Sequence, residues 1–206
     1  FNNLWLTATQ RHDYRYLTIM AQGIVDLFET EIGHFENEIS PYIFLQRTSL
    51  THCDQEMLYF AQDIVRAKDR QHLILLSEKI LEKMPYQPES TSVTTLATDA
   101  FYAAKGVCQD HAHVMIAMCK ALHLPARYVS GYLYDQNQPH LASHAWAEVF
   151  VDNQWYCFDV SNQIFSPQNH IYVAVGRDYL DVAPIRGVRE QGGVESMMSV
   201  VQVLAC

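Results

Sequence analysis

The chain has 206 residues, a hydrophobic fraction of 49% and a formal net charge of −9 at pH 7. This composition is typical of a globular domain with a core of its own. The acidic balance argues against a nucleic-acid partner, which would require a basic surface, and no apolar run of about 18 residues is present to span a membrane.

The cysteines indicate the compartment of the protein. Their number is odd, and their spacing does not resemble a disulfide framework. No signal peptide is recognisable, so the sequence predicts reduced thiols in a cytoplasmic protein. The five cysteines are Cys53, Cys108, Cys119, Cys157 and Cys206.

The N-terminal stretch has the pattern of β-strands. Residues 3–9 and 14–28 alternate and contain many β-branched and aromatic side chains, which predicts two or three strands. The chain begins with Phe1 rather than Met, so we expect these strands to be the end of a β-region whose beginning is missing. We therefore divide the chain into residues 1–35, the tail of this β-region, and residues 36–206, the principal domain.

Two amphipathic helices follow. Residues 54–68 place apolar side chains at helical spacing, with Asp54 as the N-cap. Residues 72–84 have the same periodicity, and this helix is expected to end before Pro85 because the residue preceding a proline disfavours helical geometry. Residues 85–98 are polar and predict an extended linker.

A third helix and a strand are predicted in the middle of the chain. The helix runs from about Cys108 to Leu122 and is closed by Pro125. A strand is expected over residues 126–134, and a polar loop over residues 135–143.

The next segments predict a β-hairpin. Residues 144–151 and 154–159 are strand-like and are joined by Asp152 and Asn153, which tolerate positive φ and suit a tight turn. Two further strands are predicted nearer the C-terminus, at residues 171–175 and 197–204. Because a helix-rich half precedes an antiparallel β half, the predicted fold class is α+β.

Cys108 is the residue whose position most suggests chemistry. It lies in the first turn of the third helix, where unpaired N–H groups stabilise a thiolate, lower its pKa and can hold a developing oxyanion. Gly106 would allow a tight turn and the close approach of a substrate. Asp110 in the same turn favours the helix dipole, with substrate contact as the alternative. The thiol also has a second interpretation, as an inert buried side chain.

The hairpin offers partners for this thiol. A thiol nucleophile needs a base, and the base needs an acceptor that fixes its tautomer. If the hairpin turns at Asp152 and Asn153, His144 lies opposite residue 161, two positions beyond Asp159. The two side chains are then diagonal neighbours about 7–8 Å apart at Cβ, a gap that they can bridge.

The motifs GVCQDHAH, SHAWAEVF and FDVSN, in this order, resemble those of the transglutaminase-like superfamily, and most of all its bacterial branch described as cysteine proteases. The segments LPARYVSGYL and GRDYLDVAPIRGV resemble the same branch, and the resemblance covers about residues 50–204. It implies a papain-like core, in which a helical part carrying the cysteine packs on an antiparallel sheet carrying the histidine and aspartate. By motif position, Cys108 is the nucleophile, His144 the general base and acid, and Asp159 the orienting residue. Residues 36–206 then form the catalytic domain.

The oxyanion also needs a second hydrogen-bond donor, which the three motifs leave unassigned. Classical animal transglutaminases use an upstream tryptophan, and this chain has none between Trp5 and Trp146. Tyr86 and Gln109 are the candidates for contact with the substrate or the oxyanion. Trp146 shares a strand face with His144, so it could shield the imidazole, line the cleft or belong to the core.

Cys108 has two histidines nearby in sequence, but their spacing along the helix disfavours a metal site. Only residues three or four positions apart share a helix face, so Cys108 can align with His111 but not with His113. Two ligands do not make a zinc site. We therefore expect neither a metal nor another cofactor.

Two classes of function remain. In the first, Cys108 attacks a side-chain or backbone amide of a peptide or protein substrate and forms a thioester. Hydrolysis of this thioester makes the protein an amidase or protease, which we expect for the bacterial branch, whereas an amine acceptor makes it a transglutaminase. In the second class, the chain is a non-catalytic interaction module, which the presence of all three triad residues disfavours. The sequence predicts no oligomeric state.

Overall fold

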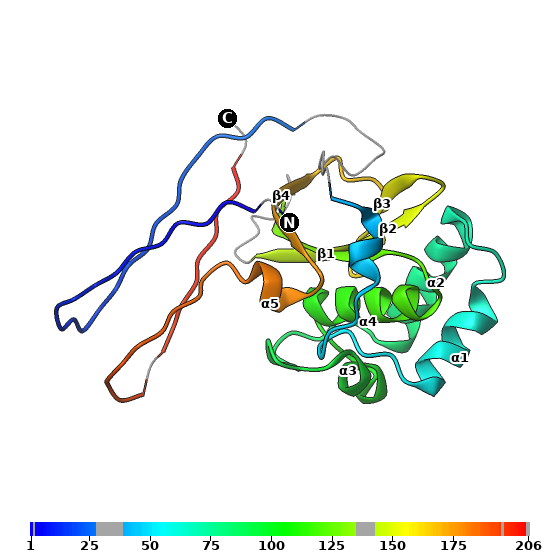
Figure 1. Ribbon diagram of the computed structural model, residues 1–206, viewed down its shortest axis with the longest axis horizontal. Helices are drawn as coiled ribbons and strands as arrows, with labels where there is room; N and C mark the ends of the chain where they lie inside the picture. Colours follow the sequence, from blue (N-terminus) through cyan, green and yellow to red (C-terminus); the bar gives the residue numbers. More distant parts are fainter. Residues whose placement is uncertain (2, 28–38, 135–142, 195, 205–206) are drawn as a thin grey trace.

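The body of the protein is a four-stranded antiparallel sheet with helices packed on one face (Figure 1). The computed structural model describes residues 1, 3–27, 39–134, 143–194 and 196–204. Helices precede the sheet along the chain, so the predicted α+β class is confirmed. The predicted boundary between residues 35 and 36 lies outside the described residues, as do residues 135–142 of the loop predicted over 135–143.

The helices form where the sequence supplies caps and apolar faces. Asp54 accepts a hydrogen bond from the N–H of Met57 at 2.9 Å, and Asp69 does the same for His72. The predicted helix over 54–68 ends earlier, at Ile64. None of the described helices is long and apolar enough to cross a membrane. The helices are η1 Pro41–Leu45, α1 Gln55–Ile64, α2 Arg70–Lys83, α3 Ala97–Ala103, α4 Cys108–Ala121 and α5 Tyr179–Val182.

Helix α4 is the centre of the body. It packs on β1 and β2 of the sheet, while α1, α2 and α3 pack against its other sides (Figure 1). All its residues from Asp110 to Lys120 are consequently buried. A helix enclosed in this way has little freedom, so its first residue, Cys108, is held firmly relative to the end of the sheet.

The sheet has the order β3-β2-β1-β4, and every neighbouring pair is antiparallel. The hairpin between β2 and β3 turns at Asp152 and Asn153, whose φ values are 51° and 61°, as the sequence predicts. β1 pairs with β4 through a bulge between Ser130 and Gly131. The strands are β1 Ala126–Leu133, β2 His144–Val151, β3 Gln154–Phe158 and β4 His170–Gly176.

The face of the sheet opposite α4 has its own buried cluster. Arg127 pairs with Glu148 at 2.6 Å, and the hydroxyl of Tyr172 donates to the same carboxylate at 2.6 Å. Phe44 of η1 packs edge-on against Trp155, and the Arg127 guanidinium lies 4.1 Å from the centroid of the Trp155 ring. These contacts, together with the short helix η1, cover the face of the sheet opposite α4.

The strands predicted at both ends of the chain are not formed. Residues 3–27 and 196–204 contain no strand in the described structure. The side chain of Asn3 hydrogen-bonds the backbone of Val175 on β4, and beyond this point the segments extend away from the body (Figure 1). Their apolar side chains are exposed, as with Leu6 at 96% and Ile24 at 82%. An alternating pattern makes a strand only where a neighbouring strand pairs with it, and these two segments have no such neighbour among the described residues.

Candidate active site

Cys108 is the first residue of α4, as the sequence predicts. The turn before it is fixed by Asp110, whose Oδ2 accepts from the N–H of Val107 at 2.8 Å and from the hydroxyl of Thr91 at 2.6 Å. A Cβ on Gly106 would lie 2.8 Å from the Cβ of Asp110. The close packing of Asp110 therefore requires a glycine at position 106, and the buried Asp110 caps the helix.

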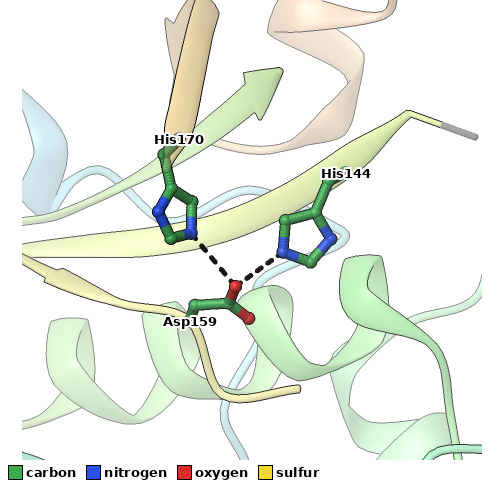
Figure 2. Close-up of side chains that lie close together, drawn as sticks. All are labelled: His144, Asp159 and His170. Atoms are coloured by element: carbon green, nitrogen blue, oxygen red, sulfur yellow. Dashed lines mark hydrogen bonds and ion pairs between the residues drawn. The ribbon is translucent and has the colours of Figure 1, made fainter. Parts of the chain in front are cut away.

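His144 and Asp159 meet through the predicted hairpin register. Ala147 pairs with Phe158 and Glu148 with Cys157, which makes His144 and Asp159 diagonal neighbours. The Nε2 of His144 lies 2.7 Å from Oδ2 of Asp159 (Figure 2). The exposed fraction is 7% for His144 and 0% for Asp159, so this hydrogen bond is shielded from water.

Asp159 is surrounded by donors. Besides His144, its Oδ2 contacts the Nδ2 of Asn162 at 2.9 Å and the Nε2 of His170 at 3.1 Å. Its Oδ1 accepts from the backbone N–H of Asn162 at 3.2 Å. Burial alone would raise the pKa of Asp159, but the hydrogen bonds from His144, His170 and Asn162 outweigh it and hold the pKa well below its usual value. The carboxyl group is thus an anion at neutral pH.

The charge of His144 follows from the same contacts. Burial alone would lower its pKa, but hydrogen bonds with Asp159 and with Cys108 outweigh it and raise the pKa to about 10. Since Nε2 is engaged by Asp159, Nδ1 is the nitrogen that remains for the Cys108 thiol. The imidazole therefore lies between the carboxylate and the thiol and stays protonated at neutral pH.

The other described cysteines have different surroundings. Cys119 and Cys157 are fully buried, and burial raises the pKa of both thiols well above the usual value. Burial likewise raises the pKa of Cys53 to about 11. Of the described cysteines, Cys108 alone combines partial exposure with a helix N-terminus and a hydrogen bond to a histidine.

The three residues predicted from the sequence to contact the substrate or the oxyanion occupy different places. Tyr86 is 52% exposed, and the pKa of its phenol is raised by burial and by the charge of Cys108, so it lies within electrostatic reach of the thiol. Gln109 donates from its side chain to the carbonyl of Val93 at 3.2 Å. Trp146 is only 1% exposed and stacks against His144 with ring centroids 5.9 Å apart. It therefore packs behind the imidazole.

The two other histidines of α4 are engaged elsewhere. His111 donates from Nε2 to the carbonyl of Met84 at 2.7 Å, and its Nδ1 contacts the hydroxyl of Ser161 at 2.8 Å. His113 accepts the N–H of Tyr179 at 3.2 Å, and burial lowers its pKa to about 3. Both rings are structural in these surroundings.

His170 is the member of the site that the sequence analysis missed. With His144 and Asp159 it forms a group of metal-ligand atoms within 4.8 Å of one another. A metal on Nε2 of His170 would put the ring proton on Nδ1, which is buried and has no hydrogen-bond partner among the described residues. Metal-bound histidines almost always donate their other N–H to an acceptor. These three residues therefore fit a hydrogen-bonded cluster better than a metal site.

The part of the chain that carries the site matches a known family. Residues 59–160, which contain Cys108, His144 and Asp159, match the family described as the transglutaminase-like superfamily. These residues form a transglutaminase-like domain. His170 lies beyond the matched range.

Relatives of the domain are found in bacteria. An uncharacterized protein of Mycobacterium leprae is 30% identical over 77% of this chain, and one of Mycobacterium tuberculosis is 36% identical over 61%. The chain covers 59% and 44% of the lengths of these two relatives. A solved structure from Cytophaga hutchinsonii, named "Putative Cysteine Protease", is 29% identical with a TM-score of 0.60 and covers 68% of this chain and 48% of its own. The papain-like arrangement of the transglutaminase-like fold is thus present.

Proposed function

We propose that the chain is a cysteine-dependent hydrolase of amide or peptide bonds that acts through a thioester on Cys108. The observation that carries this proposal is the arrangement of His144, whose Nε2 lies 2.7 Å from Asp159 and whose pKa is raised to about 10 against the effect of its burial by hydrogen bonds with Asp159 and Cys108. A protonated imidazole beside a thiol stabilises the thiolate, which is the reactive form.

The first half of the reaction follows from these positions. The Cys108 thiolate attacks the carbonyl carbon of the amide, and the new C–S bond places the negative charge on the carbonyl oxygen. N–H groups at the start of α4 can stabilise this oxygen. The imidazolium of His144 then gives its proton to the leaving nitrogen, the C–N bond breaks, and the acyl group remains on sulfur as a thioester.

In the second half, His144 takes a proton from water while the oxygen of that water attacks the thioester. The C–S bond breaks, the acid product leaves, and the thiolate and imidazolium are restored. Asp159 holds the imidazole ring in one orientation in both halves and stabilises its charge. We infer a peptide or protein substrate, in keeping with the name of the relative from Cytophaga hutchinsonii.

Mass spectrometry with a panel of peptide amides tests this proposal. We expect an acyl adduct on Cys108 and release of the free acid, with neither formed by Cys108→Ala. A primary amine should be added in a parallel series, because an amide product in place of the acid would indicate amine transfer. If the folded protein forms no adduct with any peptide of the panel, the catalytic proposal fails and a non-catalytic interaction module takes its place.

A further inference from the structure

His170 joins the active site from the far edge of the sheet. Asp159 directly follows β3 at one edge, whereas His170 begins β4 at the other. Their side chains nevertheless converge, with Nε2 of His170 3.1 Å from Oδ2 of Asp159 (Figure 2). His170 is only 2% exposed, so it cannot contact a substrate directly.

Gly131 explains how β4 comes so close. It lies on β1 opposite both His144 and Tyr172, next to the bulge in the β1–β4 pairing. A Cβ at this position would lie 2.0 Å from the carbonyl oxygen of Ile171 and 2.9 Å from Cη2 of Trp146. Only glycine therefore allows β4 and Trp146 to approach β1 as they do.

The tautomer of His170 is set by its surroundings. Its Nδ1 is buried and finds no hydrogen-bond partner in the described part of the chain. A proton on that nitrogen would be a buried, unsatisfied donor, which is costly. The ring therefore carries its proton on Nε2 and donates it to Asp159.

The donors to Asp159 are not equivalent. Asn162 lies three residues away in the same turn, so its hydrogen bonds move with Asp159 and cannot fix the carboxylate relative to the sheet. His170 belongs to another strand, and its ring is braced by Trp146 at a centroid distance of 4.6 Å. The same Trp146 stacks on His144, so one buried indole holds both imidazoles.

We propose that His170 is a positioning residue that locks the Asp159 carboxylate in the orientation that His144 requires, and so activates Cys108 without contacting the substrate. This inference rests on the function proposed above and deepens it. The active unit is then a Cys–His–Asp–His chain, in which the last imidazole donates from Nε2 and ties the aspartate to β4.

The rate of alkylation of Cys108 by iodoacetamide measures this role without any substrate. His170→Phe keeps the ring volume but removes the donor, and we expect it to slow alkylation of Cys108 about tenfold, as for loss of one hydrogen bond to a charged group. His170→Gln places an amide N–H near the position of Nε2 and should retain most of the rate. A wild-type rate in His170→Phe would overturn the inference.

A double-mutant cycle separates positioning from general support of the fold. If His170 acts through Asp159, then His170→Phe should have little further effect on alkylation in an Asp159→Asn protein. An equal loss in both backgrounds would mean that His170 only supports packing. His113→Phe is the matched control, since it replaces a buried histidine that accepts a hydrogen bond from the N–H of Tyr179, and it should leave the rate near that of the wild type.

Nitrogen NMR of the histidine side chains tests the same bond in the unmutated protein, so the inference does not depend on a variant that folds. We expect Nε2 of His170 to carry a proton in the wild-type protein, and a separate spectrum of Asp159→Asn to show a shift of this signal. A proton on Nδ1 would contradict the inference. If Cys108 of the wild type reacts no faster than Cys53, the proposed function fails instead, which is a separate result.

Discussion

The body and the two terminal segments have similar kinds of sequence but different structures. Residues 14–27 and 197–204 alternate and are rich in apolar side chains, as β1 is, yet only β1 forms a strand. The difference lies in the partners: β1 pairs with β2 and β4 and packs against α4, while the terminal segments extend from the body with exposed side chains. Apolar alternation predicts which face a strand would bury, but the neighbouring elements decide whether it forms.

The largest difference between the two regions should be in the effect of their substitutions on kcat. Cys108→Ala removes the nucleophile, and we expect kcat to fall by about 10⁶, since removal of a triad nucleophile has an effect of this order. Ile24→Ala, in the N-terminal segment, is the matched control and should leave kcat unchanged. Turnover of the peptide amide from the adduct experiment gives both rates. A comparable loss in Ile24→Ala would mean that the active site includes the N-terminal segment.

Limited proteolysis compares the regions directly. Trypsin should cleave at Arg11 and Arg15 faster than at Lys120 and Arg127 by a factor on the order of 10³ or more, because cleavage in a buried core requires opening of the folded body. The exposed N-terminal segment needs no such opening. Mass spectrometry of the early fragments checks the order. Early cleavage at Lys120 would show that the body is not a stable unit.

A substitution in the core of the body should also lower stability more than one in the N-terminal segment. Leu76→Ala on α2 opens a cavity in the core, where Leu76 is 0% exposed, and should lower the free energy of unfolding by about 2–5 kcal/mol. Ile24→Ala should change it by less than about 0.5 kcal/mol, as for other exposed positions. Denaturant titration measures both values. Equal losses would show that Ile24 packs against the body in solution.

The stability of the body should also depend on pH. The change in the free energy of unfolding per pH unit should be smaller than the effect of Leu76→Ala. The pKa of His144 is raised to about 10, so the stability that its protonated form contributes is complete below pH about 6.5 and is lost as the pH rises through about 10. Alkylation of Cys108 should likewise lose its advantage over the other thiols above that pH. Denaturation curves from pH 6 to 11 test this window, with His144→Ala as the variant that should lack the loss.

Much of the site could be predicted from local sequence. A turn at Asp152 and Asn153 fixes the register of β2 on β3, and this register brings His144 to Asp159. Local signals also predict helix α4. Gly106 lies just before its first residue, Cys108, and Pro125 follows its end. These contacts were predictable because each depends on neighbours within one hairpin or one helix.

The remaining parts depend on contacts that are distant in sequence. His170 reaches Asp159 only because β4 pairs with β1 across a bulge, and no local pattern specifies that pairing. Helix α3 has only 7 residues and follows a run of serine and threonine, so the local sequence predicts an extended linker where this helix begins. The terminal strands were predicted wrongly for the complementary reason, since their local pattern is present but no strand among the described residues pairs with them.

The central claim is that His144 activates Cys108, and the distribution of a limiting thiol reagent tests it most directly. The native protein is treated with a small amount of iodoacetamide near neutral pH, and the labelled cysteines are identified by mass spectrometry, with His144→Ala in parallel. We predict that Cys108 is labelled well ahead of the other four cysteines in the wild type and loses this preference in the variant. Equal labelling of all five cysteines, or slower labelling of Cys108, would contradict the claim.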